Sequence, residues 1–281
     1  MRKIILLIFF VLLSCEKVID IETSFSDQRL VIDAELTKNI KENFIQAKVI
    51  ISKTAPYFAE EINFINDALV QISIGDKTIK LDFNNEKNYF FAEINEIDYD
   101  NDYNLYIKYE GEVYLSLQKL LKIPKIESVT FGKRKSLIKD EVEMLITFTD
   151  PPSKGDYYLW KFGPKGEGNK YDYLAARDTY INGNQFTFSF FIDKYEYFKN
   201  DEYVTTELFG ITKDCYNYLN ILTSQAGAQP GSRPFSSANA IIKGNIYNNF
   251  NPENFPLGYF RVSEFDYFSI SKKNASDGIF N

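Results

Sequence analysis

The chain of 281 residues contains no histidine. This absence excludes Ser-His-Asp and Cys-His catalysis, histidine-held zinc or haem, and a pH switch built on an imidazole. Proline and glycine are modest, at 9 and 14 residues, whereas tyrosine and phenylalanine number 20 and 25. Because aromatic residues favour strands, this composition predicts a β-rich globular protein rather than a disordered one.

Positive charge is scarcer than negative charge. The full chain has 32 basic and 39 acidic residues. Without residues 1–14, which include Arg2 and Lys3, the chain has 30 basic and 39 acidic residues, a net charge of −9. Such a protein repels nucleic acid backbones and anionic headgroups, so we expect no nucleic acid partner and no electrostatic membrane binding.

The start of the chain has the pattern of an export signal. Arg2 and Lys3 precede an unbroken apolar run over residues 4–13, which is followed by Ser14 and Cys15. Ten helical residues rise about 15 Å, half the thickness of a bilayer core, which is too short for a stable span. We therefore predict a signal peptide over residues 1–14.

The residues Leu-Leu-Ser before Cys15 resemble a bacterial lipobox. In that chemistry the cysteine thiol accepts a diacylglyceryl group and cleavage leaves the cysteine at the N-terminus. We therefore predict a lipidated Cys15 and a short tether over residues 15–27. The alternative is an ordinary signal peptide with an incidental cysteine. Lipidation of Cys15 would leave Cys215 unpaired, so no intrachain disulfide could form in the mature chain.

Short runs of alternating apolar and polar residues recur along the chain. Residues 186–190, Phe-Thr-Phe-Ser-Phe, alternate most cleanly, and Gly75-Asp76 and Glu110-Gly111 separate neighbouring runs at hairpin spacing. The period of two predicts strands at 29–36, 44–52, 68–74, 77–83, 89–94, 103–109, 112–118, 126–131, 141–149, 157–162, 186–190, 203–209, 241–247 and 258–270.

Strands at this pitch predict a mainly β fold of two β-sandwich domains, of the Ig or transthyretin-like type. Residues 28–122 would form the N-terminal sandwich. Ile123-Pro124-Lys125 would form the joint, and residues 123–281 would form a C-terminal β-rich domain.

One stretch changes to a helical period. Cys215, Leu219 and Leu222 fall at i, i+4 and i+7, and Thr212 can cap the start. We predict one amphipathic helix over about residues 213–225, with Cys215 as a small buried hydrophobic residue.

Five segments of the chain occur in the order of a known family. Three lie near the C-terminus: GITKDCYNYL at 210–219, IKGNIYN at 242–248 and PLGYF at 256–260. Two earlier ones are 30–37 with 52–58, and 148–152 with 157–160. Together they resemble a family of Bacteroidota outer-membrane lipoproteins of unknown function, commonly encoded beside TonB-dependent receptors.

This resemblance implies an outer-membrane location and a TonB-dependent receptor as partner. The family has no established catalytic residues, so the resemblance implies no chemistry. In such lipoproteins, charged residues just after the cysteine can direct export to the outer face. Glu16, Asp20 and Glu22 follow Cys15 here, so we expect surface exposure rather than a periplasmic location.

Asp98, Asp100 and Asp102 are spaced as in calcium-binding loops, where oxygens at alternate positions converge on the cation. A complete EF-hand loop would need glycine and glutamate where Tyr103 and Tyr109 stand. The alternative is a solvated acidic turn that leads into the next strand.

Phe255, Tyr259 and Phe260 lie near four asparagines within residues 248–254. Aromatic rings with neighbouring amides can bind sugars or peptides by stacking and hydrogen bonding. The alternative is that these rings form the core face of a strand and its turn.

Two other motifs are too incomplete to indicate a catalytic or phosphate-binding site. The S-x-x-K pattern occurs three times, at Ser116, Ser136 and Ser269, without its companion motifs. The glycine-rich residues 163–168 follow a strand but lack the ending of a phosphate loop. We therefore expect no catalytic site and no cofactor.

These observations predict a lipid-anchored accessory protein of the outer membrane, associated with a TonB-dependent receptor in ligand uptake or receptor assembly. One alternative is a stand-alone cell-surface lipoprotein that binds a glycan or a peptide. A weaker alternative is a hydrolase built on carboxylates, which would require two acids in one site with displaced pKa values.

Overall fold

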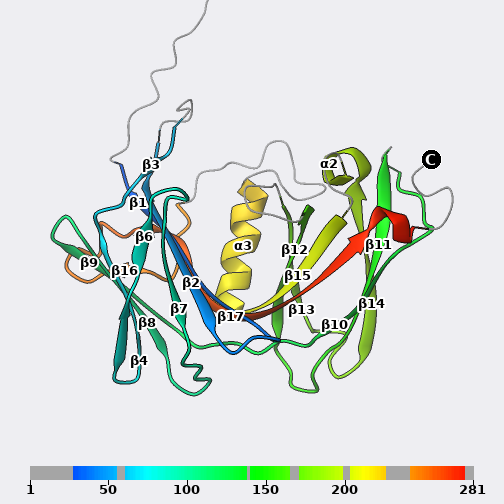
Figure 1. Cartoon of the computed structure of the whole chain (residues 1–281), viewed down its shortest axis with the longest axis horizontal. Coiled ribbons are helices and arrows are strands. Elements are labelled where there is room, and N and C mark those ends of the chain that lie inside the picture. Colours follow the sequence, from blue (N-terminus) through cyan, green and yellow to red (C-terminus); the bar gives the residue numbers. More distant parts are fainter. Residues whose placement is uncertain are drawn as a thin grey trace, which may run out of the picture.

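The computed structural model describes residues 28–55, 61–137, 140–164, 171–198, 203–225 and 241–275. The predicted signal peptide, Cys15 and the tether lie outside these residues. The described chain is mainly β, as predicted, with strands in three sheets (Figure 1).

The largest sheet has nine strands and is called the central sheet below. Its order is β13 (Asp172–Arg177), β12 (Tyr157–Pro164), β15 (Tyr203–Ile211), β17 (Leu257–Ser271), β1 (Leu30–Asn39), β2 (Ile45–Lys53), β7 (Tyr89–Ile94) and β6 (Asp82–Asn84), with β3 (Asn63–Phe64) also paired to β2.

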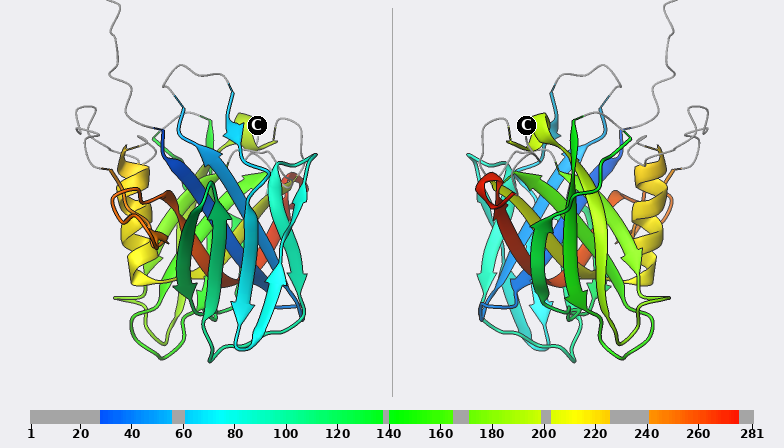
Figure 2. Two further views of the ribbon diagram at one scale, coloured as in Figure 1. Left: turned by 90° about the vertical axis from the view of Figure 1, so that its left-hand side faces the viewer. Right: turned by 90° about the vertical axis from the view of Figure 1, so that its right-hand side faces the viewer.

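A smaller sheet lies at each end of the molecule (Figure 2). The five-stranded sheet contains β16 (Tyr247–Asn248), β9 (Glu112–Gln118), β8 (Tyr103–Tyr109), β4 (Leu69–Ile74) and β5 (Lys77–Lys80). The three-stranded sheet contains β10 (Ile126–Phe131), β11 (Glu141–Thr149) and β14 (Gln185–Asp193).

Alternating residues of the central sheet contribute to two separate apolar cores. The first core joins β1 and β2 to β4, β8 and β9, and it includes Ile32 and Leu105. The second joins β12 and β15 to β10 and β11, and it includes Trp160 and Met144. Each core is therefore closed on one side by the central sheet and on the other by a smaller sheet.

The two cores are linked by β17. Its first part pairs in parallel with β1, from Val31 with Leu257 to Asn39 with Phe265. Its last part pairs antiparallel with β15. The central sheet thus contains strands from both 28–122 and 123–281 (Figure 1). The division into two domains at this boundary stays a prediction.

The helix α3 (Lys213–Gln225) has the predicted bounds. The Thr212 hydroxyl accepts a hydrogen bond from the Cys215 N–H at 3.1 Å, which confirms the predicted cap. The helix packs on the face of the central sheet opposite the two cores, in a third apolar cluster with Leu159, Phe209 and Tyr259. Further described helices are the short α2 (Lys194–Phe198) and the 3-10 turn η2 (Lys272–Asn274).

Cys215 is buried in this third cluster, as predicted. Burial raises the pKa of the Cys215 thiol to about 11, so the nucleophilic thiolate is rare at pH 8. We expect a chain without residues 1–15 to leave Cys215 unmodified by a disulfide reagent at pH 8 until denaturant is added. Rapid modification of the native protein would contradict this burial.

Several strand predictions are confirmed to the residue: 89–94, 103–109, 112–118, 126–131 and 141–149. The hairpin turns are also confirmed, since Gly75, Glu110 and Gly111 have positive φ angles of 54°, 47° and 82°.

The strand predicted at 241–247 is wrong over most of its length. Regular pairing is confined to Tyr247–Asn248. Before it, the Asn245 side chain replaces a strand neighbour: its Oδ1 accepts from the Phe260 N–H and its Nδ2 donates to the Phe260 carbonyl, both at 2.7 Å. A side-chain amide therefore satisfies backbone groups of β17 that a strand would otherwise pair.

Two further differences concern sheet edges. The strand predicted at 77–83 breaks at Leu81, whose N–H donates instead to the Val70 carbonyl at 3.0 Å. The edge strand β13, Asp172–Arg177, was not predicted, because exposed and half-buried residues follow one another there without alternation.

Candidate functional site

A cavity of about 530 Å³ opens at one end of the second core, between β11 and β14 on one side and β12 and β13 on the other. We call it the aromatic pocket. Its walls are mostly ring faces and edges, contributed by Phe148, Tyr158, Trp160, Tyr180, Phe186 and Phe188. Arg177, Asn184 and Gln185 add the polar groups. A largely apolar cavity with a few polar groups is typical of small-molecule sites.

Strand pairing places these rings together. Phe148 lies opposite Phe186 in the β11–β14 register, and the alternation in β14 puts Phe188 on the same side. The Phe148 ring centroid lies 5.3 Å from that of Trp160 and 5.8 Å from that of Tyr158. These tilted and edge-to-face contacts stabilise the back of the pocket. At its mouth, Phe186 is 39% exposed and Tyr180 is 92% exposed.

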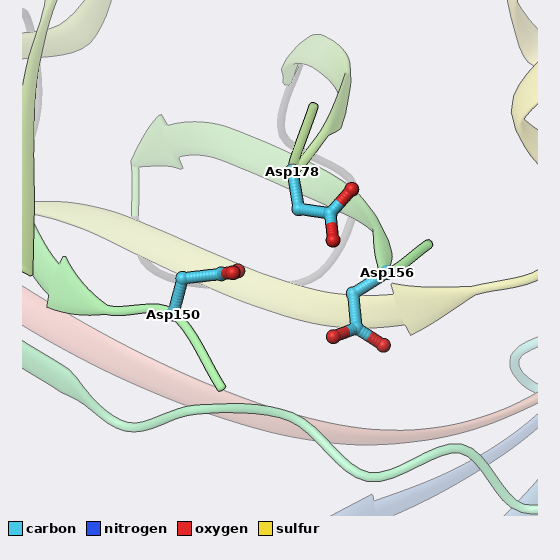
Figure 3. A group of neighbouring side chains, drawn as sticks. All are labelled: Asp150, Asp156 and Asp178. Atoms are coloured by element: carbon cyan, nitrogen blue, oxygen red, sulfur yellow. The ribbon is translucent and has the colours of Figure 1, made fainter. Parts of the chain in front are cut away.

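Three carboxylates lie next to the pocket, where three strands begin or end. Asp150 follows β11, Asp156 precedes β12 and Asp178 follows β13 (Figure 3). One oxygen of each lies within 4.8 Å of the others, so this aspartate cluster could offer three oxygens to one divalent cation. The Tyr158 hydroxyl, from the pocket wall, donates to Asp150 Oδ1 at 2.7 Å. The cluster and the pocket therefore share a side chain.

The aspartate cluster should make stability depend on pH. Burial raises the pKa of the Asp150 carboxyl above its ordinary 3.8, although the Tyr158 hydroxyl and the Gly183 N–H oppose the shift. Just above pH 3.8 the native state then binds more protons than the unfolded state, so stability falls as pH rises. We expect the free energy of unfolding of wild type minus that of Asp150→Asn to decrease from pH 4 upward, and to level off once the native carboxyl has ionised.

Urea unfolding of both proteins between about pH 4 and pH 7 measures this difference. Using the difference removes the contribution of carboxylates that do not interact with Asp150, such as Glu127, whose pKa is lowered. A difference that stays constant with pH would show that the Asp150 carboxyl has its ordinary pKa in the native state.

A second group of charges lies on the central sheet, on the face that carries α3. Glu35 pairs across the sheet with Lys48 on one side and with Arg261 on the other, and we call these three the charged row. The Arg261 guanidinium donates to Glu35 Oε2 at 2.6 Å and lies 4.5 Å from the Phe209 ring centroid. Nearby, Lys161 and Glu207 form an ion pair at 3.7 Å.

Two acids on this face have displaced pKa values. Burial and the neighbouring Glu35 raise the pKa of Asp33, although Asp33 is an exposed residue, so that solvent weakens both effects. Burial alone would raise the pKa of Glu35, but the Arg261 guanidinium and the Lys161 ammonium lower it. A carboxyl of raised pKa beside a carboxyl of lowered pKa is the arrangement expected of an acid–base pair. This is the observation that favours the hydrolase alternative.

The three predicted ligand-binding aromatics are not brought together. Tyr259 and Phe260 are consecutive in β17 and face opposite sides of the central sheet. Tyr259 packs under α3, where its ring lies 5.0 Å from that of Tyr218, and Phe260 is fully buried in the first core. Phe255 is half-buried between Arg29 and Lys243. Tyr259 and Phe260 therefore have core contacts instead of a shared exposed surface.

The predicted calcium residues lie in a turn before β8. Asp98 accepts from the N–H groups of Asp100 and Asn101 at 2.8 and 2.9 Å, and from the Asn101 side chain at 2.7 Å. These bonds lower the pKa of the Asp98 carboxyl. Within the described residues, the close carboxylate triple is the aspartate cluster, not Asp98, Asp100 and Asp102. The calcium hypothesis for this turn stays a prediction.

The aromatic pocket was not predicted from the sequence. Its signals were present separately: the alternation at 186–190, the single Trp160, and Asp150 before two prolines. No pattern within any one of these segments shows that they meet in the folded chain.

One of the S-x-x-K matches, Ser116 with Lys119, forms no catalytic pair. The Ser116 hydroxyl donates to the Asn245 carbonyl and the Lys119 ammonium donates to the Asp100 carbonyl, so the two side chains have different partners.

The described residues contain no helix with the length and apolar character needed to cross a bilayer. No curated protein matches the chain. One family profile does match, over residues 16–267, and it is described as Domain of unknown function (DUF4249). Because the match covers nearly all of the chain after Cys15, this protein belongs to the DUF4249 family.

Proposed function

We propose that this protein is a lipid-anchored accessory protein of the outer membrane, which binds a ligand and acts beside a TonB-dependent receptor. The observation that carries the binding role is the aromatic pocket, open to solvent and lined mostly by rings. The anchoring role rests on Cys15 and the signal-like residues 1–14. The receptor role rests on the resemblance to Bacteroidota lipoproteins encoded beside such receptors.

We propose that the fold consists of two domains, divided after residue 122. Residues 28–122 and 123–281 are two β-sandwich domains of the Ig or transthyretin-like type, joined through the β1–β17 pair. The two separate apolar cores support this description, and Ile246, Phe260 and Val262 of the C-terminal part complete the first core.

Replacement of Cys15 tests the anchor. Cys15→Ala should abolish incorporation of labelled palmitate and release the protein from the outer-membrane fraction, because several acyl chains, at about 0.8 kcal/mol per buried CH₂, hold the protein there. Cys215→Ala is the matched control, since Cys215 is buried, and it should leave labelling unchanged. Equal labelling of Cys15→Ala and wild type would disprove the anchor.

Affinity purification from mildly solubilised outer membranes tests the receptor. A tagged chain should bring down a TonB-dependent receptor in near-equal amount, and protease added to intact cells should digest the surface-exposed protein. Recovery of the tagged chain alone, under conditions that preserve other receptor complexes, would disprove the partnership.

The stand-alone binding protein is the second candidate, and the same pocket favours it. It predicts saturable ligand binding by the isolated protein together with the absence of a receptor in that purification. The hydrolase is favoured only by the displaced pKa values of Asp33 and Glu35. Release of nitrophenol from aryl glycosides or esters, lost in both Asp33→Asn and Glu35→Gln, would support it.

A further inference from the structure

We propose that the aromatic pocket binds a small, uncharged molecule with a flat apolar body and one hydrogen-bond donor. This inference names the ligand class for the binding role proposed above and rests on that role.

The size and lining of the pocket fit a flat ligand. A volume of about 530 Å³ accommodates two or three fused or linked rings. Trp160 and Phe148 form the inner wall, and Phe188 lies 5.0 Å from Trp160 in an edge-to-face contact. Phe186 and Tyr180 stand partly or largely exposed at the mouth. A planar ligand can stack on these rings without displacing any buried polar group.

Charges of opposite sign lie near the pocket and favour no net charge on its ligand. Arg177, an exposed residue, lines the pocket and attracts anions, whereas the aspartate cluster beside it, connected through the Tyr158 hydroxyl, repels them. Most of the lining consists of rings, which cannot replace the water around an ion, so a charged ligand would lose its hydration without a matched partner. An uncharged molecule avoids this cost.

The polar residues at the rim of the pocket indicate which hydrogen-bonding group the ligand carries. The Asn184 side-chain nitrogen already donates to the Asn182 carbonyl, and the Gln185 side-chain nitrogen donates to Glu127 Oε2. Each amide nitrogen has one of its two hydrogens engaged in this way, and each amide oxygen remains able to accept a hydrogen bond. A ligand with one N–H or O–H donor can satisfy one of these oxygens while its rings lie among the aromatic side chains.

Two probes with the same ring skeleton separate the effect of ligand shape on binding from the effect of ligand charge. N-phenyl-1-naphthylamine is uncharged and carries one N–H, and 1-anilinonaphthalene-8-sulfonate adds a sulfonate. Every described strand and helix lies after residue 27, so the chain without residues 1–15 retains all three apolar clusters and avoids detergent. Trp160 is the single tryptophan of the chain and lines the pocket, so its fluorescence reports probe entry directly.

We expect saturable quenching of Trp160 by N-phenyl-1-naphthylamine, with energy transfer to the probe, and at least tenfold weaker binding of the sulfonate. Phe186→Ala, at the mouth, should weaken binding about tenfold. Phe91→Ala removes a similarly exposed ring, 44% exposed on β7, and should leave binding unchanged. Tyr180→Ala is a second mouth variant and, at 92% exposure, it cannot disturb the core.

Three results would overturn the proposal: no saturable quenching of a protein with a cooperative thermal transition, equal loss in Phe186→Ala and Phe91→Ala, or tighter binding of the sulfonate. Failure here is distinguishable from failure of the proposed function. Lipidation and receptor co-purification can persist without probe binding, and probe binding can persist in a chain that purifies alone.

Discussion

Gly258→Ala is expected to lower the free energy of unfolding by about 3–5 kcal/mol. Gly258 pairs with Ile32 in the parallel β1–β17 ladder and has a φ of +102°, where side chains are rare. A Cβ atom there would lie 2.0 Å from the Ile32 carbonyl oxygen. Backbone strain and overpacking each cost about 1–3 kcal/mol, and here both apply to the strand that links the two cores.

Gly75→Ala provides the matched control for this substitution. Gly75 also has a positive φ, of +54°, but a Cβ there would meet nothing within 4 Å. Only the strain remains, so we expect a loss of about 1–2 kcal/mol. Urea unfolding followed by circular dichroism measures both variants. Equal losses would show that β17 does not approach β1 as closely as the structure has it.

Phe260→Ala is expected to destabilise the protein by about 3–5 kcal/mol, whereas Phe255→Ala should cost about 1 kcal/mol. Phe260 is fully buried in the first core, so truncation leaves a cavity. Phe255 is half-buried, and its main contacts are the Arg29 guanidinium at 4.4 Å and the Lys243 ammonium at 3.9 Å from its ring centroid. Removal of a half-buried ring under two cations leaves no enclosed cavity.

Urea unfolding of the two variants measures these losses, because a shift of the denaturant midpoint at unchanged slope reports a change in the free energy of unfolding. This pair also tests the sequence-based idea that Phe255 and Phe260 share a ligand site, because a site residue at the surface should be removable at little cost. A small loss for Phe260→Ala would reject its burial. A loss above about 3 kcal/mol for Phe255→Ala would show that Phe255 belongs to a core.

Local patterns in the chain predict most strands and the main helix correctly. In β8, Tyr103, Leu105 and Ile107 alternate with less buried residues, and that period is visible without any partner strand. Thr212 and Cys215 likewise define the start of α3 within a few residues of chain. Such features depend on backbone geometry and on one buried face, both of which are encoded locally.

The pairing of distant segments is not encoded in this way. The same alternation would suit Phe260 in a core or at a surface, and only the position of β17 between β15 and β1 decides that its two faces are both covered. The sequence pattern predicts that Asn245 is part of a strand. Its side-chain amide instead forms hydrogen bonds with the Phe260 backbone, because the fold places the two residues together. The aromatic pocket arises for the same reason, because the paired strands β11 and β14 face the paired strands β12 and β13.

The chain alone therefore determines its β-rich class, the bounds of many strands, the helix at 213–225, the absence of histidine chemistry, and the prediction of a lipidated Cys15. Tertiary structure alone decides that Glu35 meets Arg261, 226 residues away, and that Phe148, Trp160 and Phe186 enclose a cavity beside three aspartates. The physical reason is that periodicity records which face of a strand is buried, but not the partner against which it is buried.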